Sequence, residues 1–119
     1  MSFRIASKEA LKSKHKQHRL GAVIVKGHRI LSTGFNEIRP SHVIGTETLH
    51  AEASAVLKLL KENRLHDLAG AEMYVTRFTE GGAVGLAMPC VHCMGLVSSV
   101  GIRRLHYTTD FGTTETIKL

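Results

Sequence analysis

Two short motifs contain the residue types of a metal-dependent catalytic centre. They read H-A-E, beginning at His50, and P-C-V-H-C, beginning at Pro89. Zn²⁺ in proteins is bound by imidazole and thiolate, and a catalytic zinc site uses three protein ligands and leaves a fourth position for water. His50, Cys90 and Cys93 could supply these ligands to one Zn²⁺ per subunit. Glu52 would then be free to carry protons.

Each motif stands where a helix is expected to begin. Apolar residues recur on one helical face over 49–63, and Thr48 before them is a candidate N-cap, which puts the first motif in the first turn. A second helix is expected over 89–100, with proline at its first position. Cys90 and Cys93 are three residues apart, so their sulfurs would project from one side. Helix N-termini favour anions, which suits two thiolates.

Other interpretations of these residues explain less. A C-x-x-C pair can be a redox pair, but this leaves His50 and Glu52 without a role. A structural zinc site lacks its fourth ligand, because the chain contains two cysteines in total. His92 could be that ligand, but on a helix it is turned away from the cysteines, and we expect a polar helix residue that lines the site at most. The other histidines show no ligand spacing: His15, His18, His28, His42, His66 and His106.

Length and composition indicate one soluble globular domain over residues 1–119. Hydrophobic residues make up 43% of the chain and charged residues 22%, which is ordinary for such a protein. No apolar run is long enough for a membrane span, and the first residues carry no signal region. Two cysteines in a metal-ligand context favour a reducing compartment, so we expect a cytoplasmic protein.

The net charge of +6 is concentrated near the N-terminus. Residues 1–20 contain Glu9 as their acidic residue against six basic ones: Arg4, Lys8, Lys12, Lys14, Lys16 and Arg19. Such a segment can attract the phosphates of a free nucleotide or of a polynucleotide. It can equally be the solvated face of a first helix whose inner face is Phe3, Ala6, Ala10 and Leu11, and this second interpretation is slightly favoured.

The remaining pattern indicates an α/β fold. Strands are expected over 20–26, 29–35, 72–78, 103–108 and 113–119, the first two joined by a tight turn. With helices between them, they predict a three-layer α/β/α sandwich around a mixed five-stranded sheet. The third and fourth strands should be parallel, since a helix joins them, and the fifth should return antiparallel to the fourth.

Two connections are expected to be loops. The polar stretch with Pro40 and Gly45 should lead to the first motif without regular structure. The glycine-rich stretch 79–85 lacks the lysine and serine or threonine of a phosphate-binding loop. It could be a lid beside the metal or a long connector, and the sequence favours neither.

The motifs resemble those of the cytidine and deoxycytidylate deaminase superfamily. The resemblance extends over nearly the whole chain through L-G-A-V-I-V at 20–25, G-F-N at 34–36 and G-I at 101–102. It implies that the histidine and both cysteines bind zinc and that Glu52 shuttles protons. It also implies that Asn36 contacts the substrate sugar, with Phe35, Ala51 and Pro89 as further substrate contacts.

Details of the motifs narrow the resemblance. L-H-A-E is more similar to the deoxycytidylate and tRNA-adenosine branch than to the cytidine branch, where a cysteine usually replaces the histidine. Two features depart from the family: the final helices that grip RNA in tRNA adenosine deaminases are absent, and the stretch before His50 holds no cysteine for a second zinc. Family members form dimers, tetramers or hexamers, so we expect a homo-oligomer.

The reaction expected from this resemblance is hydrolytic deamination of a cytosine nucleotide, first of all dCMP to dUMP with release of ammonia. One alternative is a base within RNA or DNA, which the basic N-terminus favours and the short C-terminal region disfavours. Others are a free nucleoside, dCTP or guanine. A zinc-folded binding module without catalysis is the remaining hypothesis, and it leaves Glu52 without a role.

Overall fold

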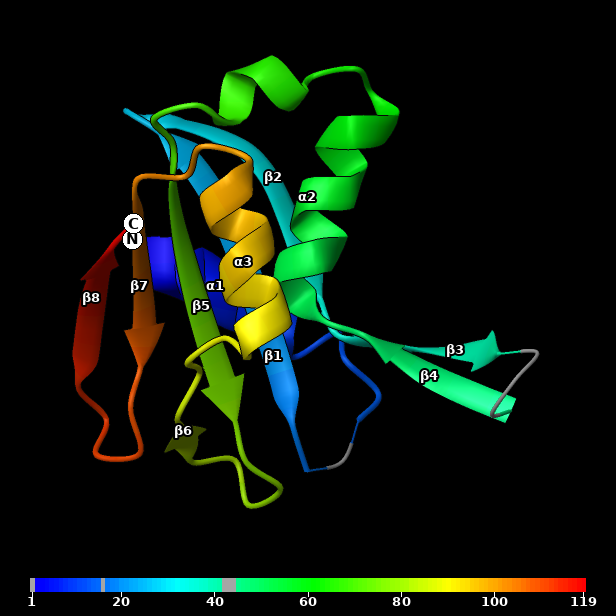
Figure 1. Ribbon diagram of the computed structural model, residues 1–119. Helices are drawn as coiled ribbons and strands as arrows, with labels where there is room; N and C mark the ends of the chain where they lie inside the picture. The colour runs from blue at the N-terminus through cyan, green and yellow to red at the C-terminus, as the bar shows by residue number, and fades with distance from the viewer. Residues whose placement is uncertain (1, 16, 42–44) are drawn as a thin grey trace.

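The fold is a mixed sheet between two layers of helices, as predicted. The computed structural model describes residues 2–15, 17–41 and 45–119. Helix α1 (Ser2–Ala10) covers one face of the sheet, and α2 (Ala51–Lys61) and α3 (Val91–Ser99) cover the other (Figure 1). Lys16 and His42, considered above, lie outside the described residues. Within them, no helix has the length and apolar character needed to cross a bilayer.

The main sheet has the order β2-β1-β5-β7-β8, with a short strand β6 paired to β5. A 3₁₀ helix, η1 (Leu65–Leu68), follows α2. The strands of this sheet are β1 (Arg19–Lys26), β2 (Arg29–Phe35), β5 (Glu72–Phe78), β6 (Val84–Gly85), β7 (Arg104–Thr108) and β8 (Thr114–Lys118).

The pairing of these strands confirms the predicted topology. β1 and β2 form an antiparallel hairpin, and β5 runs parallel to β7 with α3 in the crossover. β8 returns antiparallel to β7. The prediction missed β6, which pairs with the end of β5 at Arg77 and Phe78, beyond the part of β5 that pairs with β7. One edge of β5 therefore has two partners.

The predicted loop before the first motif is wrong. The chain there forms an antiparallel ribbon of β3 (Glu37–Ser41) and β4 (Gly45–Leu49), which projects from the body of the protein (Figure 1). A strand that covers a core shows alternating apolar residues, and this polar stretch has none. A projecting ribbon needs no such alternation, since the strands are held by their mutual hydrogen bonds.

The helix boundaries also differ from those expected. Thr48 is part of β4, and α2 begins at Ala51 with His50 as its N-cap. In the second motif, α3 begins at Val91, and Cys90 is the N-cap instead of Pro89 opening the helix. Helix α1 ends at Ala10, so Leu11 does not belong to its inner face and is 59% exposed.

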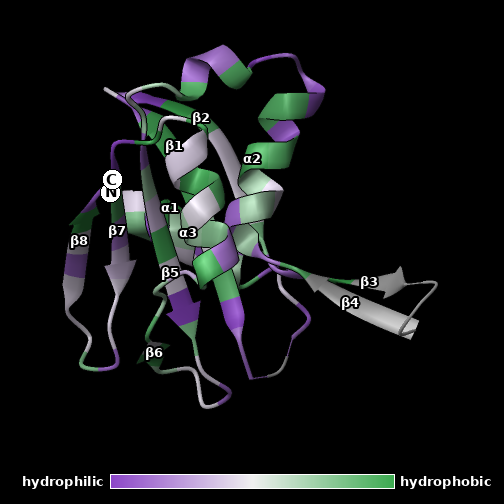
Figure 2. Ribbon diagram, viewed as in Figure 1, coloured by the Kyte–Doolittle hydropathy of each residue, from purple (hydrophilic) through white to green (hydrophobic). Residues whose placement is uncertain are grey.

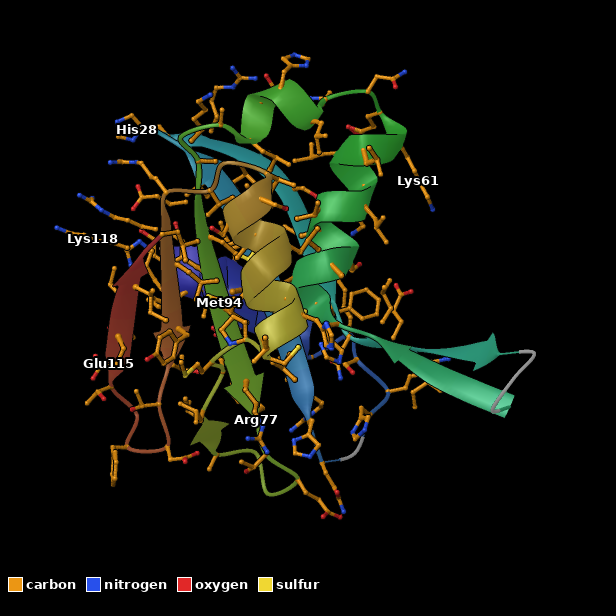
Figure 3. The ribbon with its side chains drawn as sticks, viewed as in Figure 1. His28, Lys61, Arg77, Met94, Glu115 and Lys118 are labelled. Carbon is orange, nitrogen blue, oxygen red and sulfur yellow. The ribbon has the colours of Figure 1, made fainter. Side chains whose placement is uncertain are left out.

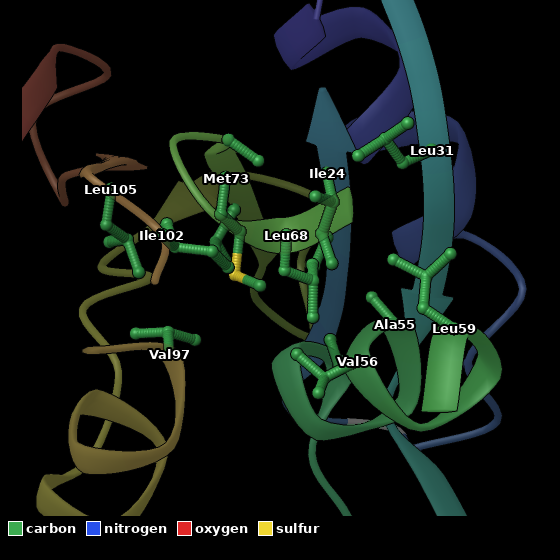
Figure 4. Close-up of a cluster of buried hydrophobic side chains, with 14 of the residues drawn as sticks. Ile24, Leu31, Ala55, Val56, Leu59, Leu68, Met73, Val97, Ile102 and Leu105 are labelled. Carbon is green, nitrogen blue, oxygen red and sulfur yellow. The ribbon is translucent and has the colours of Figure 1, made fainter. Parts of the chain in front are cut away.

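The core lies on both faces of β1. Val23 and Val25 pack with Ala6 of α1 on one face. Alternate residues of the same strand, Ala22 and Ile24, join the larger cluster under α2 and α3 (Figure 4). A strand buried on both faces is expected to be apolar throughout, as this one is. Along α2, hydrophobic and hydrophilic residues both occur, as expected of a helix with one buried side (Figure 2).

Helix α2 approaches β2 closely because Gly34 has no side chain. A Cβ atom at this position would lie 2.6 Å from the carbonyl oxygen of Ala51 and 2.6 Å from the amide nitrogen of Ala55. Both atoms belong to the backbone of α2, so neither can rotate away. Gly34 therefore sets the distance between the sheet and the first turn of α2.

We predict that Gly34→Ala destabilises the protein by about 1–3 kcal/mol, because the added methyl group forces the α2 backbone to shift. The control is Gly95→Ala on α3, where a Cβ meets nothing within 4 Å. Removing a glycine from a helix stabilises it by about 0.5–1 kcal/mol. Urea unfolding of the three proteins tests both values, and equal stability of Gly34→Ala and the parent protein would contradict the packing argument.

Candidate metal centre and active site

The first residues of the two motifs occupy equivalent positions in the structure. His50 is the N-cap of α2 with φ −69° and ψ 152°, and Cys90 is the N-cap of α3 with φ −69° and ψ 169°. Their carbonyl oxygens accept the first helical hydrogen bonds, from Ser54 at 2.9 Å and from Met94 at 2.8 Å. Neither side chain caps its own helix. Both side chains are therefore free to act elsewhere.

The structure brings the three predicted ligands together. The Nδ1 atom of His50 lies 3.3 Å from the sulfur of Cys93 and 3.6 Å from the sulfur of Cys90. All three donor atoms lie within 4.8 Å of one another. Ligand atoms on a tetrahedral zinc are roughly 3.5 Å apart, given zinc–ligand bonds of roughly 2.0–2.3 Å. The arrangement fits a three-ligand zinc centre with a fourth position for water.

The third ligand is enclosed by the protein. Cys93, in the first turn of α3, is 5% exposed, whereas His50 and Cys90 are open to solvent. Burial, and then the negative charge of Glu52, raise the pKa of the Cys93 thiol. A thiol in this position stays protonated unless a cation replaces the proton. Metal binding should therefore release a proton from Cys93.

Glu52 lies beside these ligands and has no partner for one of its oxygens. The side chain is 2% exposed, and Oε1 is buried without a hydrogen-bond partner among the described residues. Burial raises the pKa of this carboxyl, while its own backbone amide, the charge of His50 and a hydrogen bond with Cys93 oppose the rise. Buried carboxylates without partners are costly, so they are expected where a ligand or a proton transfer uses them.

One cavity of about 340 Å³ adjoins this group. His50, Glu52 and Cys90 line it, and Cys93 lies behind them. Of the expected substrate contacts, Asn36, Ala51 and Pro89 line it as well, whereas Phe35 at the end of β2 does not. The role of all four stays a prediction, since no substrate is present to contact them.

Asn36 is held by the start of β1 and by the segment that precedes it. Its Oδ1 accepts a hydrogen bond from the amide of Leu20 at 2.8 Å, and its Nδ2 donates one to the carbonyl of His18 at 2.6 Å. Its own carbonyl accepts a hydrogen bond from Ser13 at 2.9 Å. Asn36 therefore positions this segment as a wall of the cavity, besides any contact with substrate.

Other residues of the cavity wall were not expected from the sequence. His15, His18, Arg77, Leu86 and Met88 line it. The two histidines lack ligand spacing, so no sequence pattern points to them. Arg77 had a signal, since it continues the series of every second residue on β5 that begins with the buried Met73 and Val75. His92 is exposed and does not line the cavity.

The glycine-rich stretch 79–85 has the form of the connector, one of the two interpretations proposed for it, and none of its residues lines the cavity. Thr79 donates its amide hydrogen to Ala83 at 2.8 Å, and Gly82 donates to Thr79 at 3.0 Å, so the stretch turns tightly into β6. It is therefore a connector between β5 and β6. The residues that follow it, Leu86 and Met88, form part of the cavity wall.

We predict that Cys93→Ala loses the metal. The purified parent protein should contain about one zinc per chain, and the variant almost none, because two ligands do not complete the site. Plasma mass spectrometry measures the zinc content. His92→Ala is the matched control, one residue away but exposed, and should keep the parent value. A Cys93→Ala protein with a full complement of zinc would contradict the assignment.

The comparisons with known proteins agree with this geometry. The family model described as the cytidine and deoxycytidylate deaminase zinc-binding region matches residues 1–109. The deoxycytidylate deaminase of Mycobacterium phage D29 is 31% identical over 130 residues, which cover 89% of this chain and 90% of that protein.

Solved structures show the same fold. The dCMP deaminase of cyanophage S-TIM5 superposes with a TM-score of 0.70 at 25% identity, over 91% of this chain and 79% of that one. The cytidine deaminase of Burkholderia pseudomallei gives a TM-score of 0.73 at 18% identity, over 98% and 89% of the two chains. The chain belongs to the zinc-binding cytidine and deoxycytidylate deaminase family, whose members hydrolyse C–N bonds.

Proposed function

We propose that the protein deaminates a free cytosine nucleotide, converting dCMP to dUMP and ammonia. The observation that carries the proposal is that the three donors of His50, Cys90 and Cys93 lie together at one cavity, which is also lined by Glu52 with its unpartnered Oε1 atom. Two relatives support the choice of nucleotide, namely the phage D29 protein, which is named deoxycytidylate deaminase, and the cyanophage S-TIM5 dCMP deaminase.

His50, Cys90 and Cys93 would hold the metal, and Glu52 would carry the protons. When bound, zinc activates the attacking water at neutral pH. Glu52 would accept a proton from this water as the water oxygen adds to C4 of cytosine. Glu52 would then place the proton on N3. It then carries the next proton to the amino group, which leaves C4 as ammonia. Burial raises the pKa of this carboxyl, which makes it a better proton acceptor than an exposed glutamate and so suits the exchange.

The cavity can hold a small substrate, and the two relatives favour a free nucleotide over a polynucleotide. Its volume of about 340 Å³ lies in the range of sites for small molecules. Deamination of a base within RNA or DNA therefore stays the second hypothesis. The structure describes a single chain, so the expected homo-oligomer and the cytoplasmic location remain predictions.

We predict that Glu52→Gln keeps its zinc but loses activity, because the amide cannot accept a proton. The expected loss in kcat is on the order of 10²–10⁴-fold. Ammonia release and zinc content are measured on the same sample. Glu62→Gln, at the exposed end of the same helix, is the control and should behave as the parent protein. A zinc-loaded Glu52→Gln enzyme with parental kcat would rule out this role.

A substrate panel tests the choice of nucleotide. Ammonia release is measured with dCMP, deoxycytidine, cytidine, dCTP, guanine and single-stranded RNA and DNA. We expect the highest kcat/KM with dCMP. Turnover of oligonucleotides alone, with a steep loss of activity as salt increases, would favour the polynucleotide hypothesis instead. Absence of turnover on the whole panel would indicate a binding module.

A further inference from the structure

Arg77 occupies a strand position that faces the core. On β5, Met73 and Val75 are completely buried in the cluster under α2 and α3. Because side chains alternate along a strand, Arg77 points to the same face. It stands near the C-terminal end of β5, at the end of the sheet where α2 and α3 begin (Figure 3). Its side chain therefore enters the cavity that adjoins the metal ligands.

The surroundings of Arg77 hold the side chain but leave its charge uncompensated. The stem lies over Gly85 of β6, where a Cβ atom would be 3.5 Å from Arg77 Cδ. Nη1 donates a hydrogen bond to the carbonyl of Leu86 at 3.4 Å, while Nε is buried without a partner. In the part of the chain that the structure describes, no carboxylate forms an ion pair with it. A guanidinium held in this way can bind an anion.

Two histidines share this part of the cavity with Arg77. The Nδ1 atom of His15 accepts hydrogen bonds from the amides of Gln17 at 3.3 Å and His18 at 3.1 Å. The neutral ring therefore carries its hydrogen on Nε2, which remains available as a donor. Desolvation and then the positive charge of Arg77 lower the pKa of His18, so Arg77 lies close enough to act electrostatically on this ring. The group combines one fixed cation with imidazole donors.

The neighbouring Arg19 also has a buried Nε without a partner, but unlike Arg77 it does not line the metal-centre cavity. Arg19 donates a hydrogen bond to the carbonyl of Thr79 at 3.3 Å and lies over the ring of Phe78. It lines a second hollow together with Lys14 and Glu80, and this hollow shares His15 with the metal-centre cavity. The uncompensated charge of the metal-centre cavity thus comes from Arg77.

We infer that Arg77, assisted by His15 and His18, binds the phosphate of a nucleoside monophosphate and makes the enzyme prefer the nucleotide to the nucleoside. The inference rests on the proposed function, because the base must lie at the metal ligands for the phosphate to reach Arg77. Guanidinium binds phosphate through two parallel N–H donors, which gives both affinity and orientation. The imidazole N–H groups of His15 and His18 would donate further hydrogen bonds to the phosphate.

The test compares zinc-loaded parent protein, Arg77→Ala and Arg104→Ala. Arg104 is the control because it also lies in the sheet, at the start of β7 and outside the cavity. The ratio of kcat/KM for dCMP to that for deoxycytidine should fall about 10- to 100-fold in Arg77→Ala, the equivalent of one charged hydrogen bond. Arg104→Ala should keep the parental ratio. Calorimetry with dUMP and deoxyuridine measures the same preference without turnover.

The two assays separate this inference from the proposed function. If the parent protein turns over dCMP and Arg77→Ala keeps the parental ratio, the inference is wrong and the proposed function stands. If no cytosine monomer is turned over, the proposed function fails and calorimetry decides. Tighter binding of dUMP than of deoxyuridine, lost in Arg77→Ala but not in Arg104→Ala, then supports the phosphate site. Equal binding of both compounds by the parent protein overturns it.

Discussion

The metal donors come from two helices, so the centre exists only while the first turns of α2 and α3 lie side by side. Several contacts hold α2 against β2. Gly34 allows the close approach, Ser32 donates a hydrogen bond to the carbonyl of Ala55 at 2.8 Å, and Lys58 donates one to the carbonyl of Thr33 at 2.6 Å. Helix α3 is held by Val97, which is buried in the shared core. The core therefore aligns the ligands before any metal binds.

The polar groups of the site stand at the edge of an otherwise apolar cluster. The residues around Val56 and Val97 are hydrophobic, whereas Glu52 and Cys93 are buried at the helix starts. Burial disfavours the ionised form of both groups. A cation at the ligands would favour the ionised form of Cys93, since it replaces the thiol proton. A bound metal would thus stabilise the fold at the helix starts where Glu52 and Cys93 are buried.

Local patterns predicted most of the secondary structure and topology. The continuous apolar run of β1 and the turn after it predicted a buried hairpin, and the helix between β5 and β7 predicted their parallel pairing. Boundaries were less well predicted. Thr48 has the side chain of an N-cap, but pairing with Ile38 places it in β4, and His50 takes the capping position. A long-range pairing outweighed the local preference.

The identity and spacing of His50, Glu52, Cys90 and Cys93 were enough to predict a zinc centre, because ligand chemistry depends on residue type and on position in a helical turn. The sequence alone did not predict the opposite wall of the cavity. His15, His18 and Arg77 meet there only because α1 leads into β1 and β1 pairs with β5. Such contacts join segments far apart in the chain, and no local spacing encodes them. The tertiary structure alone decided which basic side chains line the same cavity as the metal ligands.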